Sequence, residues 1–274
     1  MKKHLSIIIL IILGVLGLSL LLYPTFSDWW NSYHQSKAIA SYVETVDDLS
    51  NTEVEQMLSD AKAYNESLLS KTDRWELSEE EYQVYESTLD VTGTGIMGYI
   101  EIPSISVSIP IYHGIDEEVL QIGVGHIEGS SLPIGGESTH CVLSSHRGLP
   151  SAKLFTDIDQ LVEGDLFYIH VLDQTLTYEV DQIRIVLPEE LNDLKIESGK
   201  DYCTLVTCTP YGINTHRLLV RGHRIPTEEA ASAVVSEANQ LDPLLVSVGI
   251  GIILLLLYIL ISSLIKKKIF YRFL

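Results

Sequence analysis

Basic residues are scarce in this chain. Its 274 residues include 18 lysines and arginines against 37 aspartates and glutamates, which gives a formal net charge of −19 at pH 7. A nucleic-acid-binding protein needs a basic surface to neutralise phosphates, so this balance excludes that function. The acidic excess does not indicate disorder, because hydrophobic residues make up 46% of the chain and suffice to build a core.

Cysteine is also rare, and its spacing excludes the common metal sites. The three cysteines, Cys141, Cys203 and Cys208, cannot all pair, and the sequence has no CxxC or Cys/His ligand pattern. Cys203 and Cys208 are five residues apart in one expected strand, where their side chains point to opposite faces, so a disulfide between them is not expected. Cys141 and Cys203 fall inside expected strands, and we interpret them as small core residues.

Charge is absent from two long apolar runs near the ends of the chain, residues 5–22 and 244–265. About 20 apolar residues cross a bilayer, so both runs are predicted to be transmembrane helices. We interpret the first as an anchor rather than a cleaved signal peptide. The reason is that the small-x-small site Ala38-Ile39-Ala40 is separated from the apolar run by 15 residues.

Lysines lie between each apolar run and the nearer end of the chain, at Lys2 and Lys3 and at residues 266–268. The positive-inside rule therefore predicts that both termini are cytoplasmic. The acidic residues all lie between the two runs. That middle region is expected to face the outside of the cell as an ectodomain held by two membrane spans.

The ectodomain changes from a helical to a β pattern near Gly95. Residues 27–69 have a helical, polar pattern in which Thr52 and Glu55 stand at the spacing of a capping box. The run Glu79-Glu80-Glu81 indicates a further helix start, because acidic side chains are favourable in a first turn. Beyond Gly95, short apolar runs punctuated by glycine and proline are typical of a sandwich or a closed barrel. The expected strands are 96–102, 107–112, 140–145, 166–172, 176–185, 202–207 and 217–220, with a hairpin turn at Asp173-Gln174.

Three candidate catalytic side chains stand at the ends of expected strands. Cys208 ends one apolar strand, Arg217 opens the next strand nine residues later, and His146 follows a third strand. A neighbouring cation increases the fraction of a thiol that is ionised, so these residues suit a nucleophile, an oxyanion stabiliser and an acid/base. The spacing alone also allows a buried core cysteine and an ordinary turn histidine.

The run TLVTCTPYGINTHR, from Thr204 to Arg217, closely resembles the Cys…Arg signature of sortases, the cysteine transpeptidases of Gram-positive surfaces. Ser145-His146-Arg147-Gly148 resembles their histidine motif, and the similarity extends over about residues 95–225. The resemblance implies a mainly β fold, an eight-stranded sortase β-barrel with an N-terminal helical arm. It also implies Cys208 as the nucleophile, His146 as general acid/base and Arg217 as stabiliser of substrate or oxyanion. Thioester chemistry needs no cofactor, and the sequence shows no acidic ligand set, so we expect no cofactor and no metal.

Three features resemble class C, the pilin-polymerising sortases. They are the long N-terminal arm, the Tyr-Gly-Ile-Asn-Thr-His run after Cys208 and the second apolar span. Members of that class carry a lid with an Asp-Pro-aromatic element, whose Asp contacts the active-site Arg and whose ring covers the Cys. The corresponding residues here are Asp73, Arg74 and Trp75. Proline would fix φ and stiffen the lid, so Arg74 removes that constraint.

By this resemblance the chain is a membrane enzyme of a Gram-positive cell. Its partners would be pilin subunits bearing LPxTG-type sorting signals and acceptor lysines, which it would join by isopeptide bonds. The alternatives are a housekeeping-type sortase that anchors proteins to cell-wall peptide, and a membrane-anchored scaffold without catalysis. The expected divisions are a tail and transmembrane helix (1–24), a helical arm (25–69), a lid and linker (70–95), the catalytic barrel (96–226), a linker (227–243), a second transmembrane helix (244–265) and a basic tail (266–274).

Overall fold

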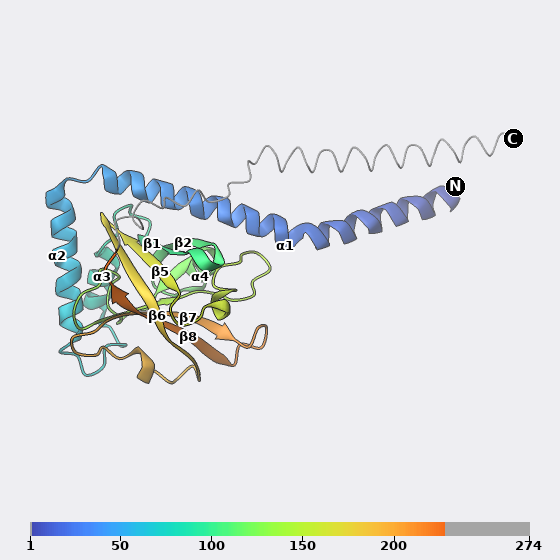
Figure 1. Ribbon diagram of the computed structural model, residues 1–274. Helices are drawn as coiled ribbons and strands as arrows, with labels where there is room; N and C mark the ends of the chain where they lie inside the picture. Colours follow the sequence, from blue (N-terminus) through green and yellow to red (C-terminus); the bar gives the residue numbers. More distant parts are fainter. Residues whose placement is uncertain (1, 228–274) are drawn as a thin grey trace. The chain divides into compact units, whose positions relative to one another are not determined.

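The computed structural model describes residues 2–227, so the predicted second span, most of the linker before it and the basic tail lie outside the described residues. Three helices come first, and a strand-rich domain follows them (Figure 1). The helices are α1 (Lys2–Asp47), α2 (Asn51–Leu68), α3 (Glu79–Ser87) and the short α4 (Glu117–Ile122). The strands are β1 (Ile96–Ile102), β2 (Val107–His113), β3 (Val124–His126), β4 (Thr139–Ser144), β5 (Leu166–Val171), β6 (Gln174–Val186), β7 (Asp201–Thr209) and β8 (His216–Ile225).

The strands close into a barrel in the order β1-β2-β3-β4-β7-β8-β6-β5, which confirms the predicted eight-stranded architecture. Two of the pairings, β2 with β3 and β4 with β7, are parallel, and the others are antiparallel. Closure leaves no free sheet edge, so every strand is paired on both sides. The interior is filled by large apolar side chains such as Met97, Ile100, Phe167 and Tyr178, all fully buried.

Side chains alternate across each wall of the barrel. On β7, Cys203 and Leu205 belong to the interior core, whereas Val206 belongs to a separate apolar cluster. Successive residues of a strand point to opposite faces, so Cys208 shares the outer face with Val206. The same parity places Arg217 on the outer face of β8, beside Leu219.

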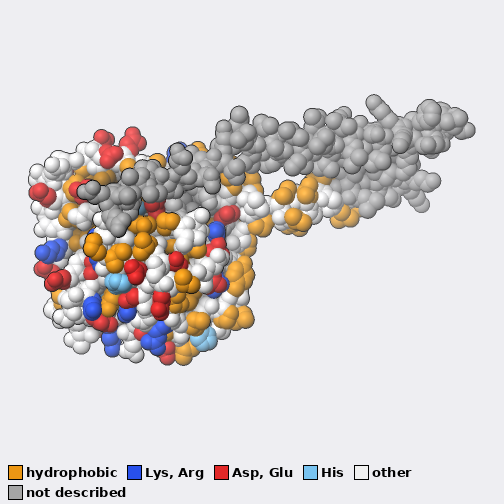
Figure 2. Space-filling model, viewed as in Figure 1, with side chains coloured by type: hydrophobic (Ala, Val, Ile, Leu, Met, Phe, Trp, Pro, Cys, Tyr) orange, Lys and Arg blue, Asp and Glu red, His pale blue; other side chains and the backbone are white. Residues whose placement is uncertain are grey.

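The helical arm packs against this barrel. Tyr42 of α1 is 1% exposed, and its hydroxyl donates a hydrogen bond to the Met97 carbonyl at 3.1 Å and accepts one from the Leu172 amide at 2.8 Å. The first part of α1 is the one described helix long and apolar enough to cross a membrane. Its hydrophobic side chains extend away from the barrel in Figure 2.

Several local predictions were wrong by a few residues. The capping box of α2 is formed by Ser50 and Glu53, not by Thr52 and Glu55, because the helix starts two residues earlier than the polar pattern suggested. The β5–β6 hairpin turns at Leu172-Asp173, since Val171 already pairs with Gln174. The strand pattern also missed β3, which has only three residues and is too short to show a period. The predicted start at Glu79-Glu80-Glu81 is confirmed in α3.

Candidate active site

The register between β4 and β7 brings His146 next to Cys208. Ser144 pairs with Val206 in the parallel ladder, and the Ser145 amide donates to the Val206 carbonyl at 3.1 Å. The Thr207 hydroxyl then donates to the Ser145 carbonyl at 2.8 Å, which keeps the two chains aligned past the end of β4. The next residue on each chain is His146 and Cys208. The thiol and the imidazole therefore emerge at the same end of two neighbouring strands.

Arg217 flanks Cys208 from the strand on the other side of β7. It pairs directly with Cys208 in the antiparallel β7–β8 ladder. Directly opposed residues on one face have side chains about 5 Å apart at their Cβ atoms. The guanidinium Nη1 donates to the carbonyls of Asn214 and His216, at 3.3 and 3.2 Å, so the β7–β8 loop holds the cation at the rim of the barrel.

Acidic and basic groups flank the histidine. The Nε2 atom of His146 is 3.5 Å from Oε2 of Glu117, which projects from the first turn of α4. A hydrogen bond from Gln121 and the charge of His146 lower the pKa of Glu117, so this carboxylate is ionised at neutral pH. The next residue, Arg147, forms an ion pair with Asp159 and fixes the loop that leaves the histidine.

An apolar floor continues from the thiol along the outer face of the barrel. Val142, Val206 and Leu219 come from three adjacent strands, β4, β7 and β8, and Val186 and Leu194 extend the cluster. Trp75 packs on this cluster together with Ile127. The indole thus occupies an apolar surface on the face that carries Cys208.

The segment from Asp73 to Trp75 is held differently from the lid that the family resemblance leads us to expect. Among the described residues, Asp73 makes no ion pair with Arg217, and its Oδ1 instead accepts a hydrogen bond from the Trp75 amide at 3.1 Å. Arg74, at the position of the usual proline, holds the segment: its guanidinium donates to the carbonyls of Gly129, at 3.0 Å, and Leu194. It also lies over the Trp75 ring, 4.2 Å from the centroid.

Comparisons with known proteins identify the family. A family model described as the sortase domain matches residues 100–225. The crystal structure of sortase C1 from Streptococcus agalactiae superposes with a TM-score of 0.69 at 52% identity, covering 70% of this chain and 100% of that one. This chain belongs to the sortase family.

Two further solved relatives are class C sortases. The Streptococcus pneumoniae sortase C, whose structure was described with respect to catalysis and pilin substrate specificity, is 45% identical with a TM-score of 0.62, covering 70% of this chain and 97% of that one. A Clostridium perfringens sortase C, solved with the C-terminal cell wall sorting motif, has the same identity and TM-score, covering 70% and 100%. The chain spans little more than half of some curated relatives, such as 56% of sortase A of Streptococcus agalactiae.

The other two cysteines of this sortase lie in the core, as predicted. Cys141 and Cys203 pair across β4 and β7 and are 2% and 0% exposed. Burial raises the pKa of the Cys203 thiol well above its ordinary value, so it stays protonated. Cys208 alone of the three is partly exposed. Among the described residues no cluster of three metal-binding side chains occurs.

Two residues of the sortase site were not identified from the sequence. Arg74 was interpreted only as a missing proline, although it ties the segment from Asp73 to Trp75 to the carbonyls of Gly129 and Leu194. Burial lowers the pKa of Arg74 to about 10, which still leaves it charged at neutral pH. Glu117 lies 29 residues before His146 in a short helix, and no motif connects the two.

Proposed function

We propose that this sortase is a membrane-anchored cysteine transpeptidase that cleaves an LPxTG-type sorting signal and joins pilin subunits by isopeptide bonds. The observation that carries the proposal is the placement of Cys208 between His146 and Arg217 at one barrel rim. The apolar floor under Trp75 supports a substrate that is an extended peptide with apolar side chains.

In the first half of the reaction, the Cys208 thiol gives its proton to His146 and the sulfur attacks the threonine carbonyl carbon. Arg217 stabilises the negative charge that develops on the carbonyl oxygen. The tetrahedral intermediate collapses, the threonine–glycine C–N bond breaks, and His146 returns the proton to the leaving glycine amine. The product is a thioester between Cys208 and the pilin threonine, and no cofactor is needed.

In the second half, a lysine amine of another pilin attacks the thioester. His146 accepts the proton of the attacking amine and returns it to the leaving sulfur, which leaves an isopeptide bond and a free thiol. The relatives support this assignment: one was solved with a cell wall sorting motif, and another was studied for pilin substrate specificity. A housekeeping-type sortase would use the same first half and differ in the acceptor amine.

The segment from Asp73 to Trp75 is proposed to act as a lid that competes with the sorting signal. Trp75 covers part of the apolar floor, and Arg74 ties the segment to loops on two sides of it. A lid closed about 99% of the time would reduce apparent activity about 100-fold, so loosening it should raise the rate of acylation.

Intact mass after incubation of the full chain, in detergent micelles, with an LPxTG-type peptide tests the proposal. We expect a thioester adduct on wild type, none on Cys208→Ala, and an undiminished adduct on Cys141→Ala, which removes a buried thiol instead. Absence of an adduct on a wild type whose Cys208 still reacts with a small thiol reagent would favour the scaffold hypothesis. Adding a lysine-bearing pilin then separates transpeptidation, which consumes the adduct into a cross-linked product, from hydrolysis by water.

The lid is tested in the same assay with Asp73→Ala/Trp75→Ala. Faster adduct formation by this variant supports an inhibitory lid. Equal rates would retain the enzyme assignment and reject the lid, so the two proposals fail separately.

A further inference from the structure

The part of α1 just beyond the apolar run carries two opposite faces with different chemistry. With 3.6 residues per turn, Asp28, Asn31 and Gln35 fall on one side of the helix. Phe26, Trp30 and Tyr33 fall on the other side, about half a turn away. We call the three aromatic residues the aromatic face and the three polar residues the docking face.

The docking face binds the two segments on either side of His146. Asn31 donates from Nδ2 to the Ser151 carbonyl at 2.7 Å, and Oδ1 of Asp28 accepts from the Lys153 amide at 2.7 Å. Both bonds hold the loop that follows His146. Gln35 donates from Nε2 to the Ile122 carbonyl at 2.9 Å.

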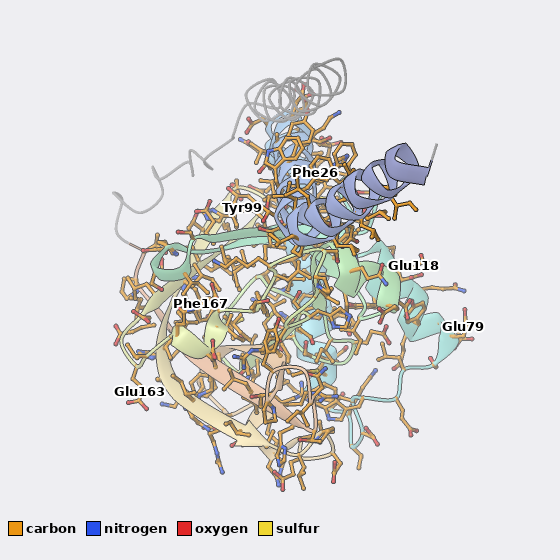
Figure 3. All side chains as sticks on the ribbon, turned by 90° about the vertical axis from the view of Figure 1, so that its right-hand side faces the viewer. Phe26, Glu79, Tyr99, Glu118, Glu163 and Phe167 are labelled. Carbon is orange, nitrogen blue, oxygen red and sulfur yellow. The ribbon has the colours of Figure 1, made fainter. Side chains whose placement is uncertain are left out.

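Ile122 ends α4, the helix whose Glu117 faces the histidine. Figure 3 shows α1 passing over this part of the barrel, with Phe26 and, on α4, Glu118 labelled. The histidine end of the active site is therefore attached directly to the segment of α1 nearest the apolar run.

The aromatic face is largely exposed, and the ring contacts of its three residues are with one another and with the neighbouring α1 side chains Trp29 and His34. Phe26 is 46% exposed, Trp30 51% and Tyr33 41%, and the rings of Phe26 and Trp30 are stacked at 6.4 Å. At the same helical spacing this exposed face continues into the apolar run through Leu22 and Tyr23, which are 43% and 54% exposed. Tryptophan and tyrosine concentrate at the boundary between the hydrocarbon core and the headgroups of a bilayer. The continuity and the residue types both identify lipid as the occupant.

We propose that the aromatic face lies in the headgroup region of a phospholipid bilayer, so that α1 leaves the membrane tilted and the barrel rests on its upper side. An upright α1 would lift Trp30 about 12 Å beyond Leu22, past an interfacial layer roughly 5–8 Å thick. A tilted α1 buries all three rings. The loop held by Asn31 then lies about one helix diameter, roughly 10–12 Å, above the headgroups. The active site is thereby fixed close to the membrane surface.

The height of the active site above the membrane determines which substrates can reach it. The inference goes beyond the proposed function, since it concerns the position of the site and not its chemistry. A site at this height selects peptide segments that are themselves held near the membrane, and it raises their effective concentration.

Tryptophan fluorescence of the full chain in phosphatidylcholine/phosphatidylglycerol vesicles tests the placement of the aromatic face. The protein has three tryptophans, so Trp29→Phe/Trp75→Phe leaves only Trp30, and Trp29→Phe/Trp30→Phe leaves only Trp75 as a matched control. Lipids brominated near the headgroup end of the acyl chain are expected to quench Trp30 and shift its emission to the blue. They should leave Trp75 unchanged. Unquenched, red-shifted Trp30 emission would overturn the proposal, because it would place the ring in water. A blue shift without quenching would also overturn it, because Trp30 would then be buried against a second copy of the chain and not in lipid.

Energy transfer from a dye on Cys208 to headgroup-labelled lipid measures the height of the active site. Cys208 is the partly exposed thiol, so it can be labelled with the other two intact. Phe26→Gln/Tyr33→Gln is expected to lower the transfer efficiency, because the aromatic face would no longer insert into the headgroup region. Val43→Ser, an exposed position of α1 off the aromatic face, is the control and should not change it. Equal transfer efficiency in the wild type and both variants would contradict the tilted placement of α1. Neither readout requires catalysis, so failure of the proposed chemistry does not affect the result.

Discussion

Arg74 and Gly129 contact each other twice. The guanidinium of Arg74 donates a 3.0 Å hydrogen bond to the Gly129 carbonyl, and the backbone of Arg74 lies directly over the glycine. A Cβ atom at Gly129 would lie 1.9 Å from the Arg74 carbonyl oxygen and 3.2 Å from Cα of Trp75. Gly129 is therefore the surface on which the lid segment rests, and its missing side chain is what permits the close approach.

Gly129→Ala should displace the lid and raise the rate of acylation of Cys208. We expect an increase of at least about fivefold, which corresponds to about 1 kcal/mol of lost lid closure. Its φ of +75° adds a strain of about 1 kcal/mol to the folded state, whatever the lid does. Gly164→Ala is the matched control, because Gly164 also has positive φ, +96°, but its Cβ would meet nothing within 4 Å. Acceleration in both variants, or in neither, would contradict the prediction.

Thr207→Val should slow acylation while the barrel stays folded. The substitution keeps the volume of a buried side chain but removes the hydroxyl that binds the Ser145 carbonyl, at a cost of about 1–2 kcal/mol. Since that bond aligns His146 with Cys208, we expect adduct formation to fall about tenfold or more. Thr204→Val is the control: it also removes a buried hydroxyl bond, to His140, but one farther along the strand. Equal activity of the two variants would show that the alignment does not depend on Thr207.

Stability should fall as the pH is lowered from about 6.5 to about 4. His140 is 1% exposed, its Nδ1 bonds to the Lys195 carbonyl at 2.8 Å, and burial lowers its pKa to about 4. In this range the unfolded chain binds a proton that the folded chain does not, so folding becomes less favourable as the pH falls. His140 contributes about 3 kcal/mol to this loss. Thermal unfolding in micelles measures it.

His140→Gln should reduce this pH dependence without abolishing it. Burial also lowers the pKa of His113, which contributes with the same sign. A slope of stability against pH that is the same in wild type and His140→Gln would assign the dependence to other groups.

One thiol of the native protein should react rapidly with an aromatic disulfide reagent. Cys208 is partly exposed, whereas Cys141 and Cys203 are buried in the core. An opening free energy of at least about 4 kcal/mol would slow their reaction about a thousandfold. Absorbance should therefore report one fast thiol per native chain, none in Cys208→Ala, and three after denaturation. Two or more fast thiols in the native protein would contradict the assignment of Cys141 and Cys203 to the core.

Residue order alone was enough to predict the candidate nucleophile, its neighbouring cation and the fold, of which the fold is confirmed. The TLVTCTPYGINTHR run predicted both Cys208 and Arg217, because a tight loop between antiparallel strands necessarily returns the chain beside itself. The apolar run at residues 5–22 and the change of pattern at Gly95 were similarly local. Alternation along β7 also separated Cys203 from Cys208 correctly, since a period of two depends only on the strand.

Only the tertiary structure decided which contacts form between segments that are far apart in the sequence. Three sets of contacts join residues that are 29 to 125 positions apart. They are the bonds of Arg74 to Gly129 and Leu194, the approach of Glu117 to His146, and the docking of α1 beside the active site. None of these contacts has a periodic signal, because each depends on how the barrel closes and which loops meet at its rim. The existence of β3 was likewise decided by its pairing with β2 and β4, whereas the start of α2 is a local feature, the Ser50–Glu53 capping box.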